Sequence, residues 1–237
     1  MKLEDLTLEI LAERALSQFD SKKLVDWAVK VLELGNECEN LYVLAGLDYN
    51  TTEERENYFW KCVVDLNLII EKNEEVLIEK YALMIANKAI RNEVSLKYAI
   101  SQLGEIVRAS KYDPRYSAFY EIDEYIDYLT YDSLVKFNKE LAIENSEDYI
   151  LDELKNFLKM EELKIPVEER NKCYCERCKK LNTPKIKNKY QLKRPFKSTV
   201  WSCEFCGSEK IKFHTNQEVK SRIIEEFKKN TSNSSLG

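Results

Sequence analysis

The chain contains Cys175-Glu176-Arg177-Cys178 and, further on, Cys203-Glu204-Phe205-Cys206, and these two C-x-x-C motifs decide how its last third folds. The motifs are separated by 24 residues. Thiolates at this spacing can surround one Zn²⁺ in a tetrahedron. Four cysteines fill all four coordination positions and leave none for water or substrate. The motifs therefore predict a structural zinc site that folds this segment and does no chemistry.

The residues around the cysteines fit short antiparallel strands. Lys185–Leu192 and Thr199–Trp201 are β-rich, and prolines mark the turns. Gly207 follows the second motif, where a residue that tolerates positive φ helps the backbone turn, whereas Lys179 stands at the corresponding place in the first motif. Residues 173–215 resemble the zinc-ribbon class, and the match lies in Cys175, Cys178, Cys203 and Cys206. The resemblance implies a fold and a metal but no particular activity, because members of the class bind nucleic acid, bind proteins or only stabilise a domain.

Two further residues leave the ligand set open. Cys173 lies two residues before Cys175 and can replace it as a ligand, and His214 is the only histidine of the chain. The alternatives are a spare thiol near the motif and an imidazole at the end of a strand. Four better-spaced thiolates already suffice for the metal.

The ribbon segment is basic and contains aromatic residues, which predicts contact with nucleic acid. Cations can neutralise phosphates, and aromatic faces can stack on unpaired bases. The alternatives are a protein partner, or aromatic residues that form a small core beside solvated lysines. The residues expected to bind nucleic acid are Lys185, Lys187, Lys189, Tyr190, Lys193, Arg194 and Lys197.

Charge divides the chain into two parts. Residues 1–163 hold 19 Lys and Arg against 34 Asp and Glu, a formal charge of −15, whereas residues 164–237 hold 18 against 8, a formal charge of +10. The predicted organisation is an acidic helical domain over 1–163, a linker over 164–172, a basic zinc ribbon with a C-terminal helix over 173–229, and a disordered tail over 230–237. We expect the acidic domain to recognise a protein partner.

The first part predicts a mainly α fold, either a multi-helix bundle or an irregular stack of helix pairs. Apolar residues recur at helical spacing in successive segments, and only 5 Gly and 4 Pro interrupt the chain. Ser21 is expected to cap one helix and Gly35 to end it, whereas Thr51 and Glu54 form a capping box for another helix.

The same part is similar to uncharacterised bacterial helical proteins, some of them from toxin-immunity settings. The similarity covers residues 20–130 and lies in Leu41–Leu47, Tyr58-Phe59 and Tyr81–Ile90. It implies an alternative function, in which the acidic domain neutralises a basic toxin. These are core-type residues, so no functional residue follows from the similarity.

Catalytic signals are weak. Glu121, Asp123, Glu124 and Asp127 can suggest a metal-dependent nuclease or other hydrolase, but they share one predicted helix and have no fitting partner motif elsewhere, which favours a solvated acidic face. The chain contains no G-x-S-x-G, glycine-rich phosphate loop or H-E-x-x-H motif. The N-terminus lacks an export signal, and no apolar stretch is long enough for a membrane helix. We therefore expect a cytoplasmic, non-enzymatic binding or adaptor protein that carries structural Zn²⁺.

Overall fold

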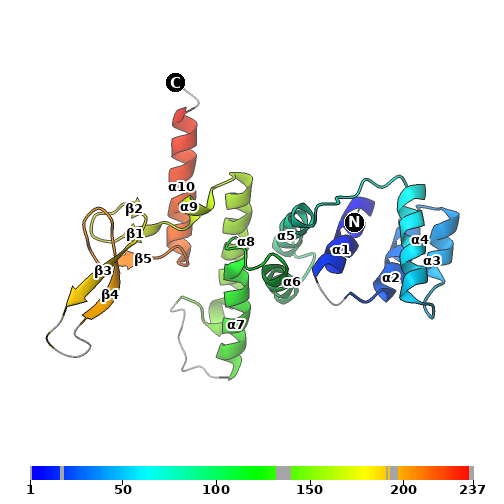
Figure 1. Ribbon diagram of the computed structural model, residues 1–237, viewed down its shortest axis with the longest axis horizontal. Helices are drawn as coiled ribbons and strands as arrows, with labels where there is room; N and C mark the ends of the chain where they lie inside the picture. The colour runs from blue at the N-terminus through cyan, green and yellow to red at the C-terminus, as the bar shows by residue number, and fades with distance from the viewer. Residues whose placement is uncertain (1, 17–18, 132–139, 191, 193–196, 235–237) are drawn as a thin grey trace. The chain divides into compact units, whose positions relative to one another are not determined.

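The computed structural model describes residues 2–16, 19–131, 140–190, 192 and 197–234. The fold is mainly α, as predicted, and small antiparallel sheets precede a C-terminal helix (Figure 1). The chain divides into two compact units, Met1–Tyr116 and Ser117–Gly237. None of the helices in the described ranges is both long and apolar enough to cross a lipid bilayer.

The first unit consists of helices that pack through their apolar faces. They are α1 (Leu3–Leu16), α2 (Lys22–Glu33), α3 (Glu39–Ala45), α4 (Thr52–Asp65), α5 (Glu74–Ile90) and α6 (Leu96–Ala109). Helix α1 packs against α2, α5 and α6, and α2 packs against α3 and α4. The capping box of Thr51 and Glu54 is confirmed, and Gly35 ends α2 with a φ of +79°. The short apolar run from Leu41, which periodicity could not classify, belongs to α3.

Ser21 precedes α2 as predicted, but its hydroxyl makes no capping hydrogen bond. The side chain is 4% exposed and accepts a hydrogen bond of 2.8 Å from Nη1 of Arg55. Arg55 is itself only 6% exposed, and it also donates to the carbonyl oxygens of Leu47 at 2.9 Å and Asp48 at 2.7 Å. A buried guanidinium therefore joins the α3–α4 loop to the start of α2.

We expect Arg55→Ala to lower the free energy of unfolding of the first unit by about 2–4 kcal/mol, because the buried Ser21 hydroxyl and two carbonyl oxygens would lose a buried charged donor. The matched control is Arg91→Ala. The side chain of Arg91 is 70% exposed, and its ion pair with Glu93 is long, at 3.9 Å. Urea unfolding followed by tryptophan fluorescence reports on this unit, since two of the three tryptophans, Trp27 and Trp60, lie in it. Equal losses in the two variants would contradict this role for Arg55.

The second unit combines helices with two small sheets. Its elements are α7 (Ser117–Tyr131), η1 (Ile143–Asn145), α8 (Ser146–Glu162), α9 (Val167–Arg170), β1 (Cys173–Cys175), β2 (Leu181–Asn182), β3 (Lys185–Tyr190), β4 (Lys197–Ser202), β5 (Ile211–Lys212) and α10 (Gln217–Ser234). One sheet has the order β2-β1-β5, and the other is the β3–β4 hairpin; all pairs are antiparallel. Helix α10 begins after Asn216, whose side-chain oxygen accepts from the Val219 amide.

The ribbon strands share a hydrophobic core with α8 and α10. This core contains Met160, Ile165, Tyr174, Val219, Ile223 and Ile224. Ile165 belongs to the predicted linker 164–172, but it is buried here and α9 follows it. The domain boundaries proposed from charge and periodicity stay a prediction.

The C-terminal helix extends further than the expected end at residue 229. Helix α10 continues to Ser234, into the segment expected to be disordered. Thr231 and Ser232 donate their hydroxyls to the carbonyl oxygens of Phe227 at 2.8 Å and Lys228 at 2.9 Å, four residues back. These bonds are compatible with helical backbone. Residues 235–237 lie outside the described residues.

Candidate metal centre

Four cysteine sulfurs meet at one point of the ribbon. The Sγ atoms of Cys175, Cys178, Cys203 and Cys206 all lie within 4.8 Å of one another. The Cys175–Cys206 and Cys178–Cys203 Sγ pairs are both 3.6 Å apart, and all four thiols are free of disulfides. Four sulfurs about 2.3 Å from a tetrahedral Zn²⁺ lie about 3.8 Å from one another. The predicted ligands are therefore clustered at a spacing that suits a metal ion.

The two cysteine motifs form the same backbone turn. The carbonyl oxygen of Cys175 accepts from the Lys179 amide at 2.8 Å, and that of Cys203 accepts from the Gly207 amide at 2.9 Å. Lys179 and Gly207 have φ values of +60° and +63°. Lys179 thus adopts the left-handed conformation that glycine adopts more easily. The missing glycine in the first motif changes the residue type but leaves the turn in place.

The surroundings of Cys175 favour a thiolate. Desolvation raises the pKa of this thiol, but hydrogen bonds from the backbone N–H groups of Cys178 and Arg177 and from neighbouring thiols oppose it, and the pKa falls to about 6. The thiolate is the form of cysteine that binds metals. The backbone N–H groups of the turn therefore stabilise a thiolate at Cys175, whereas desolvation and hydrogen bonds with neighbouring thiols raise the pKa of Cys178 to about 12.

Cys173 and His214 lie outside the sulfur cluster. Cys173 is fully buried and donates its thiol to Oδ1 of Asn182 at 3.5 Å, and burial raises its pKa to about 11. The same Asn182 oxygen accepts from the Glu204 amide at 3.0 Å, so Asn182 connects the first strand to the second cysteine motif. Burial, followed by the charge of Lys220, lowers the pKa of His214. The spacing of the cysteines did not reveal the part played by Asn182.

The β3–β4 hairpin separates the residues that the sequence grouped as a nucleic-acid site. Strand pairing places Ile186 opposite Trp201 and Tyr190 opposite Lys197. Side chains alternate between the two faces of a strand, so Lys185, Lys187 and Lys189 lie on the other face. We call the face with Ile186, Asn188, Tyr190, Lys197, Thr199 and Trp201 the outer face. Lys193 and Arg194 lie outside the described residues.

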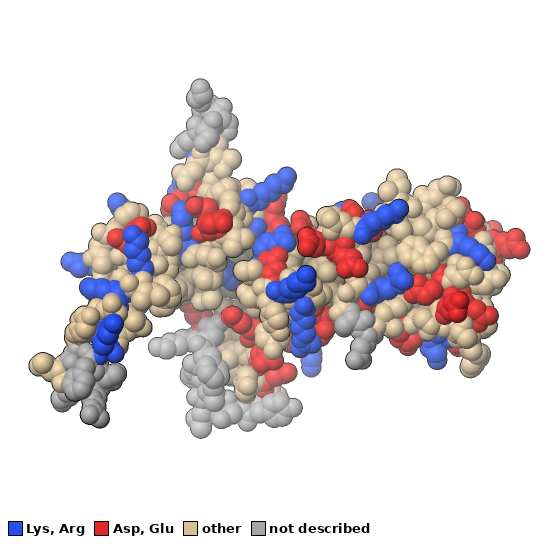
Figure 2. All heavy atoms as spheres, viewed as in Figure 1, with Lys and Arg blue, Asp and Glu red and all other residues tan. Residues whose placement is uncertain are grey.

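The hairpin is largely open to solvent. Every residue of β3 is exposed, and the side chains of Tyr190 and Trp201 are 74% and 47% exposed. Lys185 and Lys189 form ion pairs of 2.8 Å with Glu204 and Glu209. On the face drawn in Figure 2, Lys and Arg side chains gather over the ribbon strands. The hairpin therefore exposes both aromatic rings and positive charge to solvent.

The acidic residues of α7 form no such centre. Within the described part of the chain, the four cysteines are the only group of three or more His, Cys, Asp or Glu whose ligand atoms lie at metal-binding distance. Glu124 accepts instead from the Tyr120 hydroxyl of the same helix at 2.9 Å. In the described part of the chain the acidic residues of α7 therefore form no metal cluster, and the hydrolase alternative stays a prediction.

Comparisons with protein-family models, with curated proteins and with solved structures found no match. The cysteine cluster is compatible with the zinc-ribbon resemblance. No family or relative supports the resemblance of residues 20–130 to bacterial helical proteins.

Proposed function

We propose that the ribbon is a zinc-stabilised module that binds single-stranded nucleic acid through the outer face of its β3–β4 hairpin. The observation that carries the proposal is the exposure of Tyr190 and Trp201 on one face of a hairpin that is rich in positive charge. Zinc is the metal that best suits four thiolates in a tetrahedron. In this proposal the metal holds the hairpin in place and takes no part in chemistry.

Charge favours an anionic partner for this surface. Between Glu176 and Glu204 the chain has nine Lys and Arg and no Asp or Glu. The side chains of Lys185 and Lys189 are 64% and 51% exposed in these ion pairs, and exposed pairs of this kind contribute only about 0–1 kcal/mol. Phosphates can therefore compete for these two lysines on the opposite face of the hairpin, and Lys197 supplies the positive charge of the outer face itself.

The aromatic residues favour unpaired bases over a duplex. Ile186, which is opposite Trp201, and Tyr190 are four positions apart in β3. A strand rises about 3.3 Å per residue, so the two rings lie roughly 13 Å apart along the hairpin. The polar pair Asn188 and Thr199 lies between them. Bases stack on aromatic rings only when they are free of their neighbours in a duplex. Two separate rings suit a short single strand.

The whole chain then acts as a non-enzymatic adaptor. The acidic residues 1–163 carry a formal charge of −15 and are proposed to recognise a basic protein partner, whereas the ribbon contacts nucleic acid. Neutralisation of a basic toxin by the same residues is the alternative, and it predicts a tight complex that does not need the ribbon.

We expect Tyr190→Ala to weaken binding of a single-stranded oligonucleotide about tenfold, because each stacked base contributes about 1–3 kcal/mol. Fluorescence anisotropy with the full-length, zinc-loaded protein and labelled oligo-dT or oligo-U measures the effect. The matched control is Tyr49→Ala in the first unit, where the tyrosine is 97% exposed. We expect this control to bind like the unchanged protein.

The salt dependence tests the ionic part of the same contact. The variant Lys197→Ala removes one phosphate contact and should reduce the slope of log affinity against log salt by about 0.7. The control is Lys97→Ala at an exposed position of α6, which should leave the slope unchanged. Affinity that is insensitive to salt and unchanged by Tyr190→Ala would remove nucleic acid as the partner. Equal affinity for a duplex of the same length would remove the stacking argument.

A further inference from the structure

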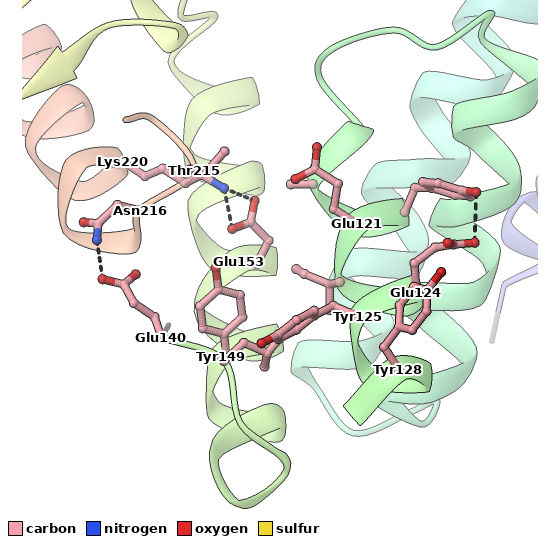
Figure 3. A pocket seen from close by; sticks show the side chains of 14 residues that line it. Glu121, Glu124, Tyr125, Tyr128, Glu140, Tyr149, Glu153, Thr215, Asn216 and Lys220 are labelled. Carbon is pink, nitrogen blue, oxygen red and sulfur yellow. Dashed lines mark hydrogen bonds and ion pairs between the residues drawn. The ribbon is translucent and has the colours of Figure 1, made fainter. Parts of the chain in front are cut away.

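A pocket of about 600 Å³ lies in the second unit between α7, α8 and the start of α10 (Figure 3). We call it the α7–α8 pocket; its described lining includes Ile122, Tyr125, Leu141, Tyr149, Glu153 and Lys220. Its volume lies within the range of about 300–1,000 Å³ that is typical of small-molecule sites. The pocket is separate from the cysteine cluster, so its chemistry can be considered independently of the ribbon.

The positive charge in the described lining is already neutralised. Lys220 is 8% exposed and Glu153 is 5% exposed, and the lysine Nζ lies 2.6 Å from both carboxylate oxygens. Gln217 donates a further hydrogen bond of 2.6 Å to Glu153. Figure 3 shows the side chains of Lys220 and Glu153 pointing toward each other. Lys220 therefore offers little attraction to an anionic ligand.

The remaining charged residues of the lining are acidic. Glu121 and Glu124 project from α7, and Glu140 lies on the opposite side of the pocket, where Asn216 donates to it. Since Glu153 and Lys220 cancel, these three carboxylates give the described lining a formal charge of −3. A charge of one sign around a cleft attracts ligands of the opposite sign and repels phosphates and carboxylates.

Aromatic rings complete the wall. Tyr125 extends from α7 toward Tyr149 of α8, and both are buried, whereas Tyr128 is 52% exposed (Figure 3). Ring faces attract ammonium groups through their quadrupole. Ile122 and Leu141 provide apolar surface between the charged positions. Carboxylates, aromatic faces and aliphatic surface together suit a cation that carries an alkyl chain.

We propose that the α7–α8 pocket binds a primary ammonium group on an alkyl chain. Two sources have this chemistry: a free polyamine and the lysine side chain of a basic peptide. The ammonium group is placed between the carboxylates of α7 and Glu140, and its alkyl chain contacts Ile122 and Leu141. This site is independent of the proposed nucleic-acid contact, which uses the opposite chemistry.

Isothermal titration of the full-length protein with spermidine tests the proposal. A peptide that has an acetylated N-terminus and a free lysine side chain, and the uncharged 1,6-hexanediol, are titrated separately. The double variant Glu121→Gln/Glu124→Gln keeps side-chain size and is expected to weaken binding of the ammonium ligand roughly tenfold. The matched control is Glu225→Gln/Glu226→Gln, which removes two charges from exposed positions of α10 outside the pocket. We expect it to change affinity less than about twofold.

The ring contribution has its own variant. Tyr128→Leu keeps apolar surface but removes the aromatic face, and we expect the affinity for the ammonium ligand to fall about two- to fivefold.

Binding of spermidine identifies a polyamine site, and binding of the peptide alone identifies a lysine side chain as the ligand; either result supports the proposal. Equal losses in the two double variants, or binding of the diol as tight as that of spermidine, would overturn it.

Discussion

Cys203→Ser is expected to abolish zinc binding and to unfold the ribbon, while residues Met1–Tyr116 stay folded. Cys203 is one of the four sulfurs of the cluster, and binding of structural zinc contributes about 10–16 kcal/mol to the folding of small metal-stabilised modules. Tyr174 of β1 contributes to the core shared with α8 and α10, but every residue of β3 is exposed, so apolar burial in the hairpin offsets little of this loss. Hydrogen exchange measured by mass spectrometry should show loss of amide protection in β1, β2 and β5 with unchanged protection in the first unit.

Two further cysteines make this prediction specific. Cys38→Ser alters a partly buried thiol of the first unit and should keep one zinc per chain. Cys173→Ser should also keep the metal, because Cys173 donates to Asn182 and lies outside the cluster. A strong chelator should reproduce the effect of Cys203→Ser on the unchanged protein. The zinc proposal fails if Cys203→Ser retains the metal or if chelation leaves the exchange pattern of the ribbon unaltered.

Features that depend on neighbours in the sequence could be predicted. The capping box of Thr51 and Glu54 needs only a spacing of three residues, and it is present. Gly35 ends α2 because a single position requires positive φ there. The cysteine cluster is a long-range feature, but a structural zinc ion takes four ligands, and two well-spaced pairs of cysteines in the sequence supply them.

Features that depend on tertiary packing could not be predicted. Arg55 and Ser21 are 34 residues apart, and Glu153 and Lys220 are 67 residues apart, so no local pattern links either pair. Ser21 has the residue type of a helix cap, yet its hydroxyl serves a buried guanidinium instead. The serine therefore predicted the start of α2 correctly, but the expected hydrogen bond between its hydroxyl and the helix backbone is not made.

Strand register explains why the predicted nucleic-acid residues are divided between two faces. The sequence places Lys185, Lys189 and Tyr190 in one short basic stretch, but neighbouring residues of a strand point to opposite faces. Only the pairing of Tyr190 with Lys197 shows which cation shares a face with the ring. For this reason the aromatic contact and the ionic contact need separate variants.

The Glu153–Lys220 pair leads to the second large effect. Glu153→Ala leaves the ammonium group of Lys220 buried at 8% exposure without its counterion. Removing one partner of a buried pair costs about 3–5 kcal/mol, and we expect this loss in the unfolding free energy of the second unit. Because the pair joins α8 to α10, hydrogen exchange should accelerate in α10 before it does in the first unit. Glu225→Ala, at an exposed position of α10, should change stability by less than about 0.5 kcal/mol.

A double replacement separates charge from packing at this position. Glu153→Leu combined with Lys220→Met removes both charges but keeps side-chain volume, and such exchanges of buried ion pairs are often neutral or stabilising. We therefore expect the double variant to recover most of the stability lost in Glu153→Ala. If it stays as unstable as the single variant, the hydrogen bonds from Gln217 and the local packing, and not the unpaired ammonium, account for the loss.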